Sequence, residues 1–245
     1  MKKIGIIFFL LLCLVFFQCY LGVPVNGYYN KQILQEGFSS TGEKVDLFRN
    51  ILDSTNSKPT ECGVMAVFTT EGSGEKAVDE ISIKLDKYYK LNKKVSKNNE
   101  AYSIYFNNDS IDGYIQSVNY ENYNVITVNI IKICSTYELE DIKSNIKMCL
   151  SGQAEKCRYF EYVKAKVEKG NVDAINKQVK SILEYWNTCN IKTIPLEDGY
   201  TSTAYTGRYE SIQSEGNLID FNYAVMKYDM GTYIIMGTPE IMETY

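Results

Sequence analysis

The stretch NLIDFNYAVMKYDMGTYIIMGTPEIMETY, residues 217–245, decides the fold class of this chain. Its first part alternates with period two, which is typical of a half-buried β-strand: one side carries Ile219, Phe221, Tyr223 and Val225, and the other Asp220, Asn222 and Ala224. Asp229-Met230-Gly231 then forms a turn, because glycine adopts a positive φ readily, and residues 232–236 resume as an apolar strand. We therefore predict that the chain ends in a β-hairpin.

The residues before this hairpin predict two helices and further strands. Ser135-Thr136-Tyr137-Glu138 has the spacing of a capping box and leads a helical stripe of Leu139, Ile142, Ile146 and Cys149. Cys157 opens a strand whose inward side is Tyr159, Val163, Ala165 and Val167. Asn171 starts a long helix with the stripe Val172, Ile175, Val179, Ile182 and Trp186, and strands follow at 190–194 and 200–205.

The first half of the chain has the same order of patterns. A capping box at 40–43 leads a helix with Phe48, Ile51 and Leu52, and a strand follows at 61–70. Gly72-Ser73-Gly74 introduces a long helix with the stripe Val78, Ile81, Leu85 and Tyr88. Strands are then expected at 101–106, 111–119 and 123–134.

Ser40 and Ser135 lie 95 residues apart, as do Cys62 and Cys157. This shared offset predicts an internal duplication, with halves at 28–134 and 135–245, each made of a helix, a strand, a long helix and three strands. Strands joined by hairpins after a long helix favour an antiparallel sheet with helices on one face, so the expected fold class is α+β.

The N-terminus has the layout of a secretory signal. Met1-Lys2-Lys3 precedes an unbroken apolar run at 4–17, and residues 25–27 offer a cleavage site before Tyr28. Residues 4–25 also approach the roughly 20 residues that span a bilayer, so residues 1–27 are either a cleaved signal or a retained membrane anchor. Both alternatives place the remaining chain outside the cytoplasm.

Composition limits the chemistry. The net charge of −4 disfavours nucleic acid as a partner, and the absence of histidine excludes catalysis through imidazole, so an enzyme of this sequence would rely on carboxylates. The five cysteines beyond the leader lack metal-site spacing, and their odd number favours buried thiols over a disulfide framework: Cys62, Cys134, Cys149, Cys157 and Cys189. We expect no cofactor and no metal.

The chain end resembles a known family. Gly237, Thr238, Pro239 and Tyr245 match the ending G-T-P-x-x-x-x-E-Y of the exported YwmB family, although the glutamate stands one place early, at Glu243. The resemblance implies two pseudo-symmetric halves that share one curved sheet, like the saddle of the TATA-box-binding protein, and it implies no enzymatic activity. Read as a sequence, Gly237-Thr238-Pro239 is a strand terminator or a docking tail.

Two surface features are candidates for binding. A lysine series covers the end of the first long helix and the loop beyond it, either as a solvated helix end or as a patch for an anionic polymer or lipid headgroups: Lys84, Lys87, Lys90, Lys93, Lys94 and Lys97. Tyrosines crowd the first-half strands, where they suit stacking on sugars or simply reflect composition: Tyr102, Tyr105, Tyr114, Tyr120 and Tyr123.

These observations predict a non-enzymatic binding or scaffolding module at the cell envelope. Its partner would be an envelope polymer or another envelope protein, with residues 4–25 as an optional membrane tether. The alternative is an envelope-glycan enzyme that uses carboxylates, from candidates at 79–80, 138–141 and 197–198. Nucleic-acid binding through the saddle ranks third.

Overall fold

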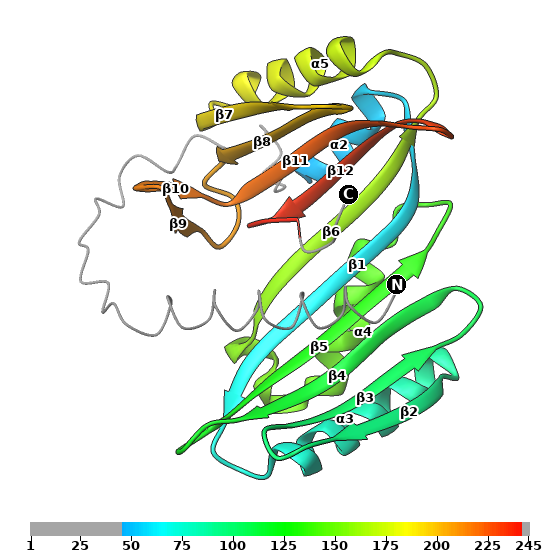
Figure 1. Ribbon diagram of the computed structural model, residues 1–245, viewed down its shortest axis with the longest axis vertical. Helices are drawn as coiled ribbons and strands as arrows, with labels where there is room; N and C mark the ends of the chain where they lie inside the picture. Colours follow the sequence, from blue (N-terminus) through cyan, green and yellow to red (C-terminus); the bar gives the residue numbers. More distant parts are fainter. Residues whose placement is uncertain (1–45, 242–245) are drawn as a thin grey trace, which may run out of the picture. The chain divides into compact units, whose positions relative to one another are not determined.

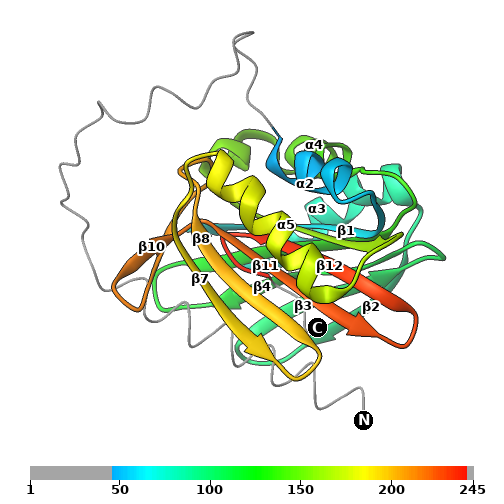
Figure 2. The ribbon, with the colours of Figure 1, turned by 90° about the horizontal axis from the view of Figure 1, so that it is seen from above.

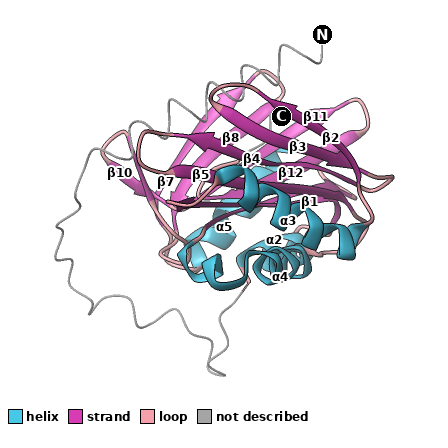
Figure 3. Ribbon diagram, turned by 90° about the horizontal axis from the view of Figure 1, so that it is seen from below, coloured by secondary structure: helices cyan, strands magenta, loops and turns pink. Residues whose placement is uncertain are grey.

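The computed structural model describes residues 46–241, which form one large antiparallel sheet of ten strands with four α-helices. All four helices lie on one face of the sheet (Figures 2 and 3). The predicted α+β class is confirmed. The leader at 1–27 and the C-terminal residue Tyr245 lie outside the described residues.

The first half of the described chain runs helix, strand, helix and four strands. In order these are α2 (Leu47–Ser54), β1 (Ser57–Thr70), α3 (Gly74–Tyr89), β2 (Asn92–Lys97), β3 (Ala101–Asn107), β4 (Ile111–Asn119) and β5 (Asn124–Ile133). One strand, β2, was not predicted. Its sequence, NKKVSK, contains one apolar residue, Val95, and is exposed throughout, because β2 is an edge strand and buries neither side.

The second half comprises α4 (Leu139–Leu150), a 3₁₀ turn (Ser151–Lys156), β6 (Arg158–Val167), α5 (Val172–Tyr185), β7 (Cys189–Leu196), β8 (Gly199–Tyr205), β9 (Ile212–Ser214), β10 (Asn217–Ile219), β11 (Phe221–Tyr228) and β12 (Gly231–Thr238). The predicted terminal hairpin is β11 and β12, in which Tyr228 pairs with Gly231. The small β9–β10 ribbon was not predicted and stands apart from the large sheet.

The strand order in the large sheet is β2-β3-β4-β5-β1-β6-β12-β11-β8-β7 (Figure 1). The long strands β1 and β6 therefore pair at its centre, although partners such as Gly63 and Tyr162 lie 99 positions apart in the chain. One continuous core fills the space between the sheet and the helices, and it includes Val64 and Ile115 from the first half and Val163 and Tyr223 from the second. The two halves consequently share a single core.

Polar caps fix the helix starts. The Ser73 hydroxyl accepts the backbone N–H of Lys76 at 3.3 Å, and the Asn171 amide oxygen accepts that of Ala174 at 2.8 Å. For α2 the cap is Asp46, whose carboxylate accepts the N–H of Arg49 at 3.1 Å. Ser40, the cap expected from the sequence, lies outside the described residues.

The sequence predicts that one side of the strand at 219–225 is exposed, and this prediction is wrong. Phe221, Tyr223 and Val225 face the helices as predicted, but Asn222 and Ala224 on the opposite side are also buried. Asp220 interrupts the strand because its buried carboxylate turns away to accept hydrogen bonds from Thr206, Arg208 and Tyr209. A short alternating pattern does not reveal such a second layer of contacts.

Among residues 46–241, no helix combines the length and the apolar character needed to cross a membrane.

Candidate binding face

The sheet face opposite the helices is uncovered by any described helix, and its side chains follow from the strand register. Figure 1 looks onto this face, with α4 behind the strands. Residues paired across neighbouring strands point to the same side of a sheet. One row of pairs runs across six strands, from the edge strand β2 to β6: Lys94, Tyr105, Tyr114, Asn129, Met65 and Phe160. We call these six residues the central row.

The central row is aromatic and polar at its outer end. The rings of Tyr105 and Tyr114 lie 6.2 Å apart and are tilted by 48°. Both tyrosines are half-buried, so each presents part of its ring to solvent, and the exposed Lys94 is the cross-strand neighbour of Tyr105. This arrangement combines a ring platform with a cation.

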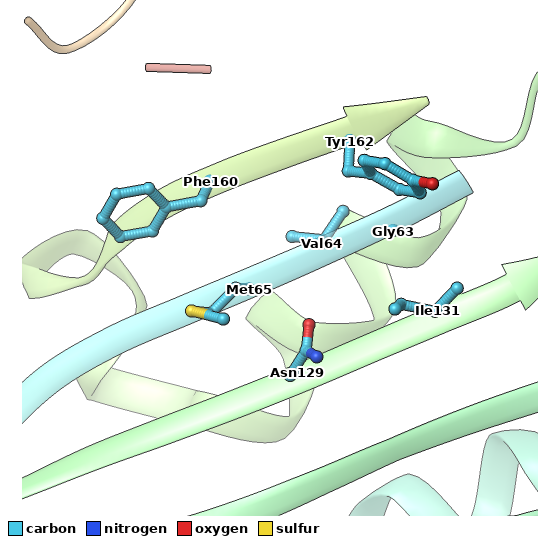
Figure 4. A pocket seen from close by; sticks show the side chains of 7 residues that line it. All are labelled: Gly63, Val64, Met65, Asn129, Ile131, Phe160 and Tyr162. Carbon is cyan, nitrogen blue, oxygen red and sulfur yellow. The ribbon is translucent and has the colours of Figure 1, made fainter. Parts of the chain in front are cut away.

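At its inner end the row passes a shallow depression between β5, β1 and β6 (Figure 4). Met65 and Asn129 lie next to it, and Phe160 and Tyr162 flank it from β6. Its cavity volume is only about 10 Å³, close to that of a single water site. Met65 and Asn129 are buried, with 4% and 8% of their surface exposed, so the part of the central row that faces solvent is its outer end at Lys94, Tyr105 and Tyr114.

Beyond β6 the same face carries a cluster of basic and aromatic side chains. The Lys164 ammonium lies 5.5 Å from the ring centre of Tyr228 and 5.8 Å from that of Tyr233, and those two rings meet edge to face at 5.4 Å. Glu61 accepts a hydrogen bond from the Tyr162 hydroxyl at 3.1 Å and lies 3.8 Å from the Lys164 ammonium. These contacts hold the cation in place above the rings.

The family-like motif closes this end of the face. As expected of a terminator, β12 ends at Thr238, whose hydroxyl accepts the backbone N–H of Glu161 at 3.3 Å. The chain then turns back over the sheet, where the N–H of Ile241 donates to the Asn222 side chain at 3.3 Å. Ile241 packs on a small second cluster, namely Tyr162, Ala224, Met226 and Ile235. The strand therefore ends within the Gly237-Thr238-Pro239 motif.

The lysine series does not form one surface. Lys93 and Lys94 are neighbours in β2, so they lie on opposite faces of the sheet. Lys84 donates to the Cys149 carbonyl at 3.2 Å, Lys93 contacts the Ser82 carbonyl and Asp86, and Lys97 pairs with Glu75. Lys87 lies in the last turn of α3 and Lys90 is its C-cap. Lys94 alone among the six belongs to the central row.

The five tyrosines of the first-half strands do not lie on one surface either. Tyr102 lies on the helix side, where its hydroxyl donates to Asp79 at 2.8 Å and this bond raises the pKa of the phenol. Tyr120 and Tyr123 stack at 5.1 Å at the β4–β5 turn. Tyr105 and Tyr114 remain on the open face. The sequence analysis includes Tyr105 and Tyr114 among five candidate tyrosines. Only the strand register shows that these two, and not the other three, share the open face.

The candidate carboxylates are spread over different elements. Asp79 is bonded to Tyr102, Glu80 pairs with Lys76 along α3, and Glu138 contacts Lys132. Residues 197–198 form the turn between β7 and β8. Within residues 46–241, no group of three or more side chains of the metal-binding types is placed to hold an ion.

A larger open groove, with a volume of about 330 Å³, lies on the helix side between α2 and α5. It is crossed by contacts that join the helices: Gln178 donates to the Ser54 carbonyl at 2.5 Å and Trp186 to the Asn50 side chain at 3.4 Å. Arg208 stacks on Trp186 at 5.1 Å. The hydrogen bonds of Gln178 and Trp186 thus join α5 to α2 within the groove, and Tyr185 at its edge is 77% exposed.

No protein-family model matches this chain, and no curated protein matches it.

Proposed function

We propose that this chain is an extracytoplasmic, non-enzymatic binding module that holds an anionic envelope polysaccharide on its open sheet face. The observation that carries the proposal is the central row, which brings the exposed Lys94 and two half-buried tyrosine rings into one line on the sheet. With strands about 4.8 Å apart, six strands give a track of about 24 Å. Such a track matches an extended polymer that crosses the strands.

The chemistry of the row suits a charged sugar chain. Tyrosine rings offer flat apolar surfaces and a polar tip, and cations attract carboxylate or phosphate groups. The cluster of Lys164, Tyr228 and Tyr233 repeats the combination of cation and rings on the second half of the face. Sites of this kind at both ends favour a repeating ligand.

The fold proposed for this module is the saddle expected of the YwmB family. In support, the strand order reads outward from the β1–β6 pair in the same way on both sides: β5, β4, β3 and β2 on one, and β12, β11, β8 and β7 on the other. Each half also supplies a short helix before its central strand and a longer one after it. An internal duplication explains this correspondence most simply.

Export rests on the basic and apolar leader at 1–27, and residues 4–25 would serve as a tether if the leader is retained. The glycan-enzyme alternative gains no support from the dispersed carboxylates, because hydrolysis needs two of them across one cleft. Nucleic-acid binding remains the third alternative, because the net negative charge of the chain disfavours contact with phosphates.

The experiment is co-sedimentation of the full chain, in mild detergent, with an insoluble anionic envelope polysaccharide and with duplex DNA in parallel, at several salt concentrations. We expect saturable binding to the polysaccharide that weakens with salt, and an unchanged polymer afterwards. Release of soluble sugar would indicate an enzyme, and binding only to DNA would overturn the proposal.

A matched pair of variants tests the face itself. The double variant Tyr105→Ala, Tyr114→Ala should weaken polysaccharide binding at least 10-fold, because two ring platforms are lost. Tyr185→Ala removes a tyrosine that is 77% exposed on α5, on the other side of the molecule, and should bind like the parent chain. Equal binding by all three proteins would refute the open face as the site.

A further inference from the structure

Two thiols meet in the core where β1 passes the end of β5. Cys62 lies in β1, and Cys134 directly follows Ile133, the last residue of β5. The backbone N–H of Cys134 donates to the Thr60 carbonyl at 3.0 Å, which extends the β1–β5 ladder by one residue. Both side chains belong to the core on the helix side, and their sulfur atoms lie 3.2 Å apart.

This separation is shorter than the roughly 3.5–4.0 Å of ordinary carbon contacts. A disulfide would require the sulfurs to approach to about 2.05 Å. Cys134 follows Ile133, the last residue of β5, so the adjustment falls at the end of the strand and not in its interior. The pair therefore needs only a small local shift to become covalently linked.

The two thiols are also chemically distinct. The Cys134 thiol donates a hydrogen bond to the Cys62 sulfur, and this bond holds the pKa of Cys62 below its ordinary value against the opposing effect of burial. The same bond, together with burial, raises the pKa of Cys134. Cys62 is accordingly the better source of the thiolate that attacks a disulfide.

We propose that Cys62 and Cys134 are a disulfide-forming pair, which a disulfide oxidant outside the cytoplasm closes as the chain folds. The inference rests on the proposed export for its biological setting, and on the sulfur geometry for its chemistry. The Cys62 thiolate first attacks a disulfide R–S–S–R, forms a mixed disulfide between Cys62 and R, and expels R–S⁻, which takes up the proton that Cys62 lost. The Cys134 sulfur then attacks the Cys62 sulfur and expels the second R–S⁻, which takes up the proton that Cys134 gives up. The two cysteines lose two electrons, and R–S–S–R gains them as two R–SH.

If this disulfide forms, the sequence-based interpretation of the cysteines as unpaired thiols does not hold for Cys62 and Cys134. The bond closes a loop of 72 residues and ties the central strand β1 to the segment that leads into α4. A loop of this length strongly restricts the unfolded chain, so the oxidised protein is expected to be the more stable form. Cys189 is exposed and Cys149 is buried in α4, so they provide controls for reagent access and for cysteine removal.

The test uses the full chain, unfolded and reduced, then refolded with a mixture of reduced and oxidised glutathione. After alkylation, a peptide map without reduction should contain a Cys62–Cys134 cross-link. Reduction should lower the Tm of the oxidised protein by about 10 °C. The Cys134→Ala variant should lose both signals, whereas Cys149→Ala should keep both.

Alkylation of both Cys62 and Cys134 after oxidative refolding would overturn the proposal. It would also be overturned if reduction lowered the Tm of Cys134→Ala as much as that of the parent chain. This result does not depend on where the protein resides. Rapid acid trapping and alkylation of the chain from intact cells tests the setting separately. A pair that links on refolding but stays reduced in cells supports the site and contradicts export.

Discussion

At the scale of single residues, Gly237 shows how the tail constrains the sequence. A Cβ placed on Gly237 would lie 2.5 Å from the Glu240 carbonyl oxygen and 2.7 Å from the Ile241 Cα, both of them backbone atoms. The tail turns back so closely over β12 that a side chain at this position has no room. Glycine is therefore needed for the close approach, which gives a physical reason for the first residue of the G-T-P motif.

We predict that Gly237→Ala lowers the free energy of unfolding by about 1–3 kcal/mol, because the tail has to move away from β12. Urea denaturation followed by circular dichroism measures this change. The control is Gly152→Ala, where an added Cβ meets nothing within 4 Å and a change within about 0.5 kcal/mol is expected. Equal stability of the two variants would show that the tail does not pack as described.

The neighbouring Glu240 gives a prediction in pH. Burial raises the pKa of its carboxyl above the unfolded value. This group therefore favours folding below its unfolded pKa of about 4.3, and that contribution is lost as the pH rises through the folded pKa. At neutral pH, Glu240→Gln should be more stable than the parent by roughly 0.5 kcal/mol, after allowance for screening of a half-exposed group. Below pH 4 the difference should vanish.

Denaturation curves at pH 7 and at about pH 3 measure this effect. Glu215→Gln is the matched control of opposite sign, because the contact with Lys192 lowers the pKa of Glu215. That variant should gain no stability at neutral pH. If both glutamine variants behaved alike, a general loss of negative charge would explain the result better than burial of Glu240.

At the scale of elements, β2 makes the strongest distinction between neighbouring residues. Lys93 points to the helix side, where its ammonium lies 3.4 Å from Asp86 and donates to the Ser82 carbonyl at 3.1 Å. Lys94 points to the open face next to Tyr105. The two lysines are adjacent in sequence, yet one holds the edge strand to α3 and the other belongs to the proposed binding track.

We predict that Lys94→Glu weakens polysaccharide binding about 10-fold without changing stability, since it removes and reverses a charge on the track. Lys93→Glu should leave binding nearly unchanged and lower the free energy of unfolding by about 1 kcal/mol, because it places a carboxylate beside Asp86. Binding and urea unfolding of both variants measure the contrast. Equal loss of binding in both would favour diffuse attraction over a defined face.

The elements also show what a sequence reveals and what it hides. The predicted stripe at Leu139, Ile142, Ile146 and Cys149 is fully buried, and the inward side of β6 is the predicted one, because apolar periodicity reports the face that meets the core. The edge strand β2 was not predicted, because neither of its sides carries the apolar residues that mark a buried face. Ladder register decides which tyrosines share a face, and register depends on pairing between distant segments, so the central row was hidden in the sequence.

At the scale of the whole molecule, the two halves are joined too tightly to act as separate domains. The ladder between β1 and β6 runs from Ser57 to Val67 on one side, and both halves contribute to one core. Trp186, the single tryptophan of the chain, lies at the end of α5 in the second half. Its fluorescence therefore reports the local packing of α5, which includes the contact with Asn50 of α2, whereas circular dichroism reports the whole sheet.

This difference allows the coupling of the halves to be measured. Ile115 is fully buried in β4, so Ile115→Ala should cost about 2–5 kcal/mol through the cavity that it leaves. If the shared core makes unfolding a single transition, the variant lowers the urea midpoint of Trp186 fluorescence and that of circular dichroism by the same amount. Ile83→Ala, at a position that is 62% exposed, should change neither. A fluorescence midpoint that ignored Ile115→Ala would mean that the second half unfolds by itself, and a ligand bound across both halves would then have to join two independent units instead of resting on one rigid track.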